Sequence, residues 1–275
     1  MSNRSGFYRR LVLAILLGLP SPPIASQQPA VPQTGILGNI VEITAGDFFF
    51  IAPESIPAGL TTFRLRQFGK FAHDMSILRL TQGKTFEEFV ALAAAGQPRP
   101  WAMNLGGPGF IDPPLSMNAT LVLEPGTYVL ACFVTAPGDP SEHQRMFRPL
   151  QVAPALGARS TEPVTDLVVK ILEDGYEFSP SLSAGRHLVR VENATSQRRL
   201  FRMERILPGR TAEEALAWRP QRLTVPDTLR PTEPKGRLAG FEPGQHLIMS
   251  VDLDAGTYLV SSLPNRTTSQ VFVVH

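Results

Sequence analysis

The sequence predicts an all-β protein of two tandem Greek-key sandwiches, each interrupted by one short helix. Short alternating or apolar runs recur along the chain and are separated by Gly, Pro and Asn turns, which is typical of sandwich strands. The two halves also share motifs at similar separations. Gly83-Lys84-Thr85 and Gly209-Arg210-Thr211 lie 126 residues apart, and Gly126-Thr127-Tyr128 and Gly256-Thr257-Tyr258 lie 130 apart. Two copies that differ by loop variation account for both separations.

In the first half, five segments have the composition of strands, namely 61–66, 73–80, 119–126, 127–134 and 148–153. A helix is predicted over 86–95, because Thr85 and Glu88 match a capping box at its start. One face of this helix is apolar and consists of Phe86, Phe89, Val90 and Ala93. Because that face would pack on the sandwich, we interpret the helix as a structural lid and not as a catalytic element.

In the second half, residues 187–206 resemble residues 61–80, and Thr211 with Glu214 repeats the capping box. A segment rich in Ala, Pro and Gly at 153–165 has the composition of a linker. We therefore expect one domain over 38–153 and a second over 165–275.

The N-terminus has the pattern of a secretory signal peptide over residues 1–26. A basic start is followed by an apolar run over 11–19 that is too short to span a bilayer, and then by small residues up to Ser26. A short membrane anchor is the alternative, which the length of the run disfavours. We therefore expect a periplasmic or secreted protein with no integral membrane segment after cleavage.

Charge and cysteine content narrow the function classes. Cleavage would remove three arginines, so the formal net charge of +2 would become −1, and no Lys/Arg tract would remain to favour nucleic-acid binding. The chain has one cysteine, Cys132, and therefore cannot form an internal disulfide. Since an exposed free thiol outside the cytoplasm is liable to oxidation, Cys132 is expected to be buried and inert, or bound to a metal.

Three other side chains could join Cys132 at a metal. His143 and Met146 follow it before a strand-like ending, and His73 lies upstream where a strand follows a turn. Thiolate, imidazole and thioether are ligands that copper prefers. The four positions therefore form a candidate copper site, provided that they meet at one end of the sandwich.

This order of residues resembles the cupredoxin, or blue copper, family. The segments that carry the resemblance are GKFAHDMSI at 69–77 and PGTYVLACFVTAPG at 125–138, followed by a histidine and a methionine before a last strand. The resemblance implies a cupredoxin-like sandwich over 38–153 and a degenerate copy after it. It further implies one copper ion held by His73, Cys132, His143 and Met146, and a role in electron transfer or copper handling with a redox or copper-donor protein as partner.

Other interpretations of the same residues stay open. The loop from Cys132 to His143 is longer than usual for the family, and His143 and Met146 are closer together than usual. Other sulfur donors could lie in or near the site, namely Met75, Met103 and Met117. The chain could also be a metal-free tandem sandwich that binds or scaffolds partners outside the cytoplasm, with Cys132 as a core residue of its strand.

The second copy lacks these candidate ligands. Alignment of the halves places Arg199 where His73 stands and Ser262 where Cys132 stands, and residues 263–274 contain no histidine or methionine. We interpret the remaining histidines as surface or strand residues, namely His187, His246 and His275. The second domain is therefore expected to be structural or partner-binding.

The sequence contains no recognisable motif of the common enzyme classes. The glycine-rich segment 105–109 is not followed by the Lys-Ser/Thr of a phosphate cradle, so we expect a loop there. No Ser-His-Asp set or carboxylate pair has informative spacing. Since the candidate copper site also shows no open position or second metal, the sequence led us to expect that the chain is not an enzyme.

Overall fold

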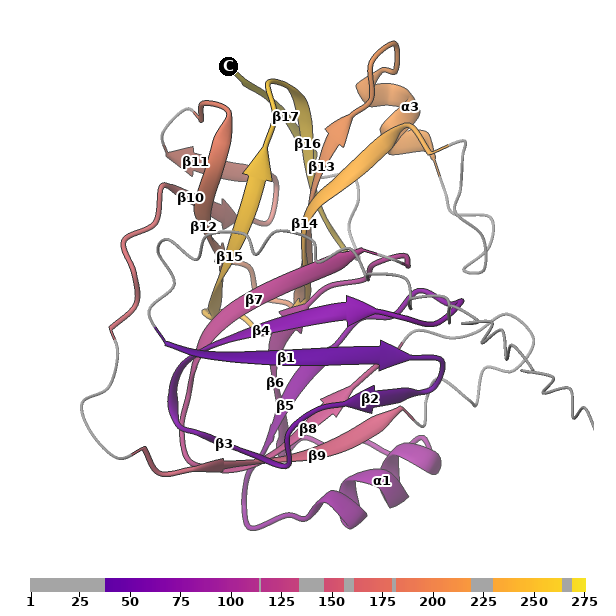
Figure 1. The fold of residues 1–275 in the computed structure, drawn as a ribbon, viewed down its shortest axis with the longest axis vertical. Coiled ribbons are helices and arrows are strands. Elements are labelled where there is room, and N and C mark those ends of the chain that lie inside the picture. The colour runs from indigo at the N-terminus through magenta and orange to yellow at the C-terminus, as the bar shows by residue number, and fades with distance from the viewer. Residues whose placement is uncertain are drawn as a thin grey trace, which may run out of the picture. The chain divides into compact units, whose positions relative to one another are not determined.

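Two β-sheets dominate the structure, a computed structural model (Figure 1). It describes residues 38–113, 115–133, 146–155, 161–179, 182–218, 230–263 and 269–275. One sheet has eight strands and the other nine, and they make two tandem Greek-key β-sandwiches, each with one short helix. The all-β fold class predicted from the sequence is therefore confirmed. The predicted signal peptide, 1–26, lies outside the described residues.

The first sandwich contributes four strands to the eight-stranded sheet, namely β1 (Asn39–Gly46), β2 (Phe49–Ile51), β4 (Gly59–Gln67) and β7 (Ser116–Leu123). Its contribution to the nine-stranded sheet is β3 (Ser55–Pro57), β5 (Ser76–Leu80), β6 (Ala102–Pro108), β8 (Gly126–Ala131) and β9 (Phe147–Ala153). Strand β5 pairs antiparallel with both β6 and β8. The predicted strand over 73–80 is shorter than expected, since β5 begins at Ser76.

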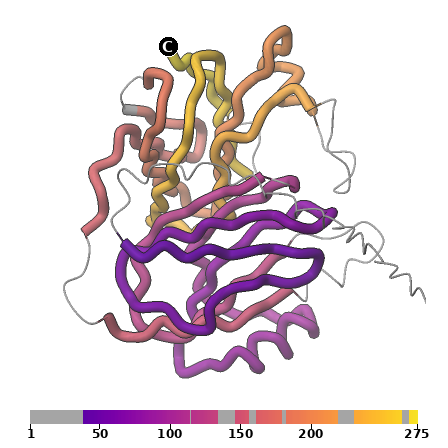
Figure 2. The backbone as a smooth tube through the Cα atoms, in the orientation of Figure 1, coloured from indigo at the N-terminus to yellow at the C-terminus, as the bar shows by residue number. Residues whose placement is uncertain are grey.

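The second sandwich repeats this order, and its strands run from red to yellow in Figure 2. Its strands in the eight-stranded sheet are β10 (Leu167–Ile171), β11 (Tyr176–Ser179), β12 (Gly185–Asn193) and β15 (His246–Leu253). In the nine-stranded sheet they are β13 (Arg199–Ile206), β14 (Thr232–Phe241), β16 (Gly256–Leu263) and β17 (Ser269–Val274). A short helix, α3 (Ala212–Ala217), follows β13.

Helix α1 (Phe86–Ala94) is built as the sequence predicts, one residue shorter at its end. The Glu88 amide donates to Thr85 Oγ1 at 3.2 Å and the Thr85 amide donates to Glu88 Oε2 at 2.9 Å, which closes the capping box. Phe89 is fully buried on the sheet, with Trp101 and Phe147 against its ring. The helix therefore covers the outer face of the nine-stranded sheet.

Similar contacts occur in both halves at the separations seen in the sequence. Tyr128 Oη donates to the Glu124 carbonyl at 2.9 Å, and Tyr258 Oη donates to the Asp254 carbonyl at the same distance. The capping box of α1 likewise has its counterpart at Thr211 in α3. In both halves the tyrosine contact thus ties the start of one strand, β8 or β16, to the turn that precedes it.

The two halves belong to one compact unit, Gly35–His275, and both sheets run through it. Strand β6 pairs antiparallel with β14, and β7 pairs antiparallel with β15. In each pair the two strands hold the same place in their own sandwich. The Asn118 side chain adds two hydrogen bonds to the Ser250 backbone, one to the carbonyl at 2.8 Å and one from the amide at 2.7 Å. The division into domains at 153–165 stays a prediction.

One sequence expectation about the backbone is corrected. The glycine-rich segment 105–109 was expected to be a loop, but Leu105–Pro108 lies in strand β6, between β5 and β14. Its glycines permit close approach of the neighbouring backbones, since a Cβ atom at Gly107 would lie 2.2 Å from the Met75 carbonyl oxygen. The glycines that suggested a loop thus allow close packing of β6 against its neighbouring strand.

In the part of the chain that the structure describes, no helix has the length and apolar character needed to cross a membrane.

Candidate metal centre

The structure brings His73 and Cys132 together at one end of the first sandwich. His73 precedes β5 by three residues and Cys132 directly follows β8. Because β5 and β8 run antiparallel, with Ser76 opposite Ala131, the start of one strand lies beside the end of the other. His73 Nδ1 lies 3.7 Å from Cys132 Sγ, and neither side chain is exposed to solvent. The thiol and one imidazole of the candidate set are therefore in contact.

Backbone and side-chain contacts fix the orientation of His73. Its amide donates to the Ile111 carbonyl at 3.2 Å, and the Ile111 amide donates back at 3.0 Å. On the far side of the ring, Nε2 lies 3.8 Å from Asp47 Oδ1. The same carboxylate oxygen accepts hydrogen bonds from the amides of Lys70 at 2.8 Å and Phe71 at 3.1 Å. Asp47 thus holds both the turn before His73 and the far edge of its ring.

Met146 also reaches the site. The Cys132 amide donates to the Met146 carbonyl at 3.1 Å. The Met146 side chain is buried in the same hydrophobic cluster as Cys132, Met75 and Ile111. The backbone of Met146 therefore lies beside Cys132, and the side chains of Met146 and Met75 are both buried. Met103, by contrast, is 45% exposed on β6.

His143 lies outside the described residues, in the segment 134–145. The described residues contain no group of three or more His, Cys, Asp or Glu side chains placed to hold a metal ion. The four-ligand set predicted from the sequence therefore stays a prediction, of which three members are described and lie at one end of the sandwich.

The residues present suit a copper ion. Bonds of about 2.3 Å to sulfur and about 2.0 Å to nitrogen, at an angle of about 110–120°, place the two ligand atoms about 3.5–3.7 Å apart. The separation of 3.7 Å between Cys132 Sγ and His73 Nδ1 lies in this range. Soft sulfur donors and an imidazole are ligands that suit copper and zinc. The donor chemistry and the measured separation therefore agree.

A second carboxylate lies beside the sulfur. The Phe133 amide lies 3.4 Å from Asp74 Oδ1. Burial raises the pKa of Asp74 above its ordinary value, and hydrogen bonds from the Cys132 side chain and the Phe133 amide oppose that rise. In the metal-free chain the Asp74 carboxylate thus accepts a hydrogen bond from the Cys132 thiol. Because a thiol binds a metal as the thiolate, metal binding would have to release the thiol proton.

The two carboxylates were missed by the sequence analysis, although a signal for one of them exists. Asp47 directly follows the first strand, and Glu173 stands 126 residues later, at the separation shared by the Gly-Lys-Thr and Gly-Arg-Thr motifs. Asp74 adjoins His73 in the chain, but nothing in the sequence indicates that it faces the sulfur.

The equivalent place in the second sandwich holds an ion pair. Arg199 is buried at the position matching His73, and its Nη2 lies 3.1 Å from Glu173 Oε2. The Glu173 carboxylate also accepts a hydrogen bond from the Ser196 amide at 2.6 Å, as Asp47 does from Lys70. The pairing with Glu173 accounts for the buried position of Arg199.

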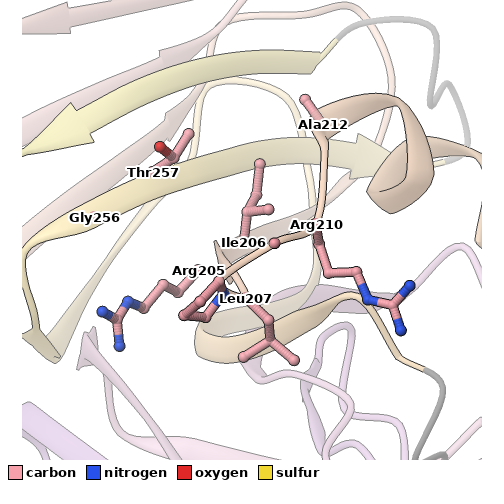
Figure 3. Close-up of a pocket in the computed structure, with 9 residues that line it drawn as sticks. Arg205, Ile206, Leu207, Arg210, Ala212, Gly256 and Thr257 are labelled. Atoms are coloured by element: carbon pink, nitrogen blue, oxygen red, sulfur yellow. The ribbon is translucent and has the colours of Figure 1, made fainter.

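Two surface hollows are lined by other residues. One, of about 320 Å³, lies beside α3 and is lined by Arg205, Arg210 and Thr257 among others (Figure 3). The two arginine side chains extend in opposite directions in Figure 3, and each already pairs with a carboxylate, Asp254 or Glu214. A hollow of about 520 Å³ lies beside α1 in the first sandwich. Neither hollow contains a candidate metal ligand.

Comparisons with known proteins give structural similarity only. No family model matches the chain, and no curated protein matches it. Auracyanin A, a "blue" copper protein from Chloroflexus aurantiacus, is 19% identical over 42% of this chain and 98% of its own, with a TM-score of 0.31. A multicopper oxidase is 15% identical over 86% of this chain and 88% of its own, with a TM-score of 0.26.

A third similar structure is the copper-containing nitrite reductase of Thermus scotoductus, which is 10% identical over 86% of this chain and 60% of its own, with a TM-score of 0.23. It and the multicopper oxidase are enzymes. The expectation that this chain is not an enzyme is therefore wrong, because enzymes are among the proteins of similar fold. At these identities and TM-scores the likeness concerns the fold and assigns no activity.

Proposed function

We propose that this chain binds one copper ion in its first sandwich and uses it for electron transfer or copper handling. The observation that carries the proposal is the contact between two fully buried donors, His73 Nδ1 and Cys132 Sγ, at a separation that suits a shared metal. The buried Met146 beside them supplies the thioether expected at a copper site.

In this proposal each residue has a separate task. Cys132 would supply a thiolate ligand, His73 and His143 the imidazoles, and Met146 a thioether. Copper, when bound, supplies one-electron chemistry between its two oxidation states. Asp47 orients the His73 ring from behind, as carboxylates commonly do for metal-binding histidines. The surrounding apolar cluster keeps water from the sulfur.

The proposal includes the cellular setting and the second sandwich. The basic and apolar N-terminus supports export, which places the protein in the periplasm or outside the cell. A redox or copper-donor protein would then be its partner. We take residues 165–275 as a degenerate copy of 38–153, in which the pair Arg199–Glu173 replaces the candidate metal donors.

The test is titration of the purified, mature chain with copper(II) sulfate. We expect one equivalent to bind and an intense visible absorption band to appear, because thiolate-to-copper(II) charge transfer is strong. Cys132→Ser should abolish the band and His73→Ala should weaken or shift it, whereas Met146→Leu should keep the band and change the reduction potential. Met103→Leu, at an exposed methionine, is the matched control and should change nothing.

A wild-type chain that binds no copper at stoichiometric concentrations, in either oxidation state, would contradict the proposal. The metal-free tandem sandwich that binds or scaffolds partners would then be the better account.

A further inference from the structure

The backbone at His73 is not held by its own sheet alone. Residues 108–111 run antiparallel to residues 73–75, through the two bonds between His73 and Ile111 and a third from the Met75 amide to the Pro108 carbonyl at 3.0 Å. The position of the His73 ring in the site therefore depends on where the segment 108–112 lies.

The opposite edge of that segment is held by strand β14 of the second sandwich. The Gly109 amide donates to the Arg237 carbonyl at 2.8 Å, and Pro108 pairs with Leu238. Arg237 Nη1 also donates to the Phe110 carbonyl at 3.0 Å. The segment thus lies between His73 on one side and β14 on the other.

Two glycines allow this three-way approach. A Cβ atom at Gly107 would lie 2.2 Å from the Met75 carbonyl oxygen, and one at Gly109 would lie 2.7 Å from the Arg237 carbonyl carbon. Any larger residue would force one of the neighbouring backbones away. The glycine-rich motif at 105–109, which indicates no phosphate site, is thereby explained as the contact between the two sandwiches.

Ion pairs from the second sandwich hold the segment at two further points. Arg237 is 1% exposed and forms an ion pair with Glu204 on β13. Arg230 Nη1 lies 2.7 Å from Asp112 Oδ2, and its Nη2 lies 3.8 Å from Glu204 Oε1. The links to Phe110 and to Asp112 flank Ile111, the residue whose backbone pairs with His73. Movement of the buried Arg237 would break its ion pair with the Glu204 carboxylate and leave Arg230 as the more distant partner.

We propose that Arg237 and Arg230 are positioning residues for the candidate metal centre, and that the second sandwich holds His73 against Cys132 through residues 108–112. The second copy, which lacks the candidate ligands, would then be a rigid support for the site in the first. That this site binds copper rests on the proposed function, whereas the placement of His73 beside Cys132 can be tested without metal.

The test compares three single variants with the wild-type chain. Arg230→Gln removes the link to Asp112 and leaves Arg237 paired with Glu204. Arg237→Lys keeps the charge but loses the planar fork that serves Glu204 and Phe110 together. Asn118→Ala is the matched control, because it removes two hydrogen bonds between the sandwiches at β7 and β15 and leaves residues 108–112 intact.

The first readout is the rate at which a thiol reagent labels Cys132 in the metal-free, folded chain, alongside the free energy of unfolding in urea. Since Cys132 is fully buried, labelling requires local or global opening. We expect labelling to rise about tenfold or more in Arg230→Gln and Arg237→Lys, beyond the rise that their loss of global stability explains. In Asn118→Ala the labelling rate should follow global stability alone.

The second readout is the copper(II) absorption band and the electron paramagnetic resonance spectrum, which should change in both arginine variants and not in Asn118→Ala. If the arginine variants label like Asn118→Ala at equal stability, the inference is overturned. If the wild-type chain binds no copper, the proposed function fails while the labelling comparison still decides this inference. If Arg237→Lys does not fold, Arg230→Gln carries the test alone.

Discussion

Asp47 lies behind the ring of His73, with its Oδ1 3.8 Å from Nε2, while Nδ1 on the other edge faces Cys132. The same oxygen accepts the Lys70 amide, so its position is fixed by the turn and not by the ring. In the second sandwich the equivalent carboxylate, Glu173, pairs with Arg199. Both sandwiches therefore have an acidic residue at this position, Asp47 or Glu173. The residue that faces it differs: His73 is a candidate metal ligand, whereas Arg199 forms an ion pair.

The first prediction concerns Asp47→Asn. The amide keeps the size of the side chain and its oxygen can still accept the Lys70 amide, but the negative charge beside Nε2 is lost. Because outer carboxylates orient metal-binding histidines and raise their basicity, copper affinity should fall about 10- to 100-fold with the visible band retained. Competition titration with a copper chelator measures this affinity.

Glu42→Gln is the control for Asp47→Asn, since it removes an exposed carboxylate on β1, the strand before Asp47, and that carboxylate pairs with Arg64. It should leave the copper affinity unchanged. Equal affinities in wild type and Asp47→Asn would show that the carboxylate only shapes the turn.

Sequence reasoning reached the strands, both capping boxes and the contact of His73 with Cys132, because these follow from local patterns and from two neighbouring antiparallel strands. It did not reach the pairing of β6 with β14, because such partners share no local signal and glycine in a strand looks like a turn. Nor did it place Arg199 inside, since a buried guanidinium depends on a partner, Glu173, that comes from another strand.

The second prediction concerns the helix that covers the nine-stranded sheet. Phe89→Ala should destabilise the chain by about 3–5 kcal/mol, because it removes a fully buried ring packed against Trp101 and Phe147. Val90→Ala, at a partly buried position of the same helix, should cost much less. Urea unfolding followed by tryptophan fluorescence measures both. A copper band of unchanged energy in folded Phe89→Ala would support the structural role of the helix.

The third prediction concerns stability at acid pH. Hydrogen bonds from Ser196, together with the nearby Arg199, hold the pKa of Glu173 below its ordinary value. A carboxyl whose pKa is lower in the folded chain stabilises it above the unfolded-state pKa, about 4.3. That contribution is lost as the pH falls from there through the folded-state pKa.

Glu173→Gln should therefore flatten the fall of the urea midpoint below about pH 4.3, with a lower midpoint at neutral pH. Asp252→Asn, at an exposed carboxylate 3.9 Å from Arg186, is the control. If Glu173→Gln and the wild-type chain have parallel midpoint curves across this range, the carboxylate contributes nothing to the acid dependence.

The last prediction separates backbone strain from steric contact at the junction of the two sandwiches. Gly107 and Gly126 have nearly the same φ, 149° and 152°, so alanine at either position is strained by its backbone conformation. Their surroundings differ, because a Cβ atom at Gly107 would lie 2.2 Å from the Met75 carbonyl oxygen, whereas at Gly126 nothing would lie nearer than 3.8 Å. Both variants should lose about 1–3 kcal/mol from strain. Gly107→Ala should lose more, and Cys132 labelling should rise in it alone, because the new methyl group displaces the backbone two residues beyond His73.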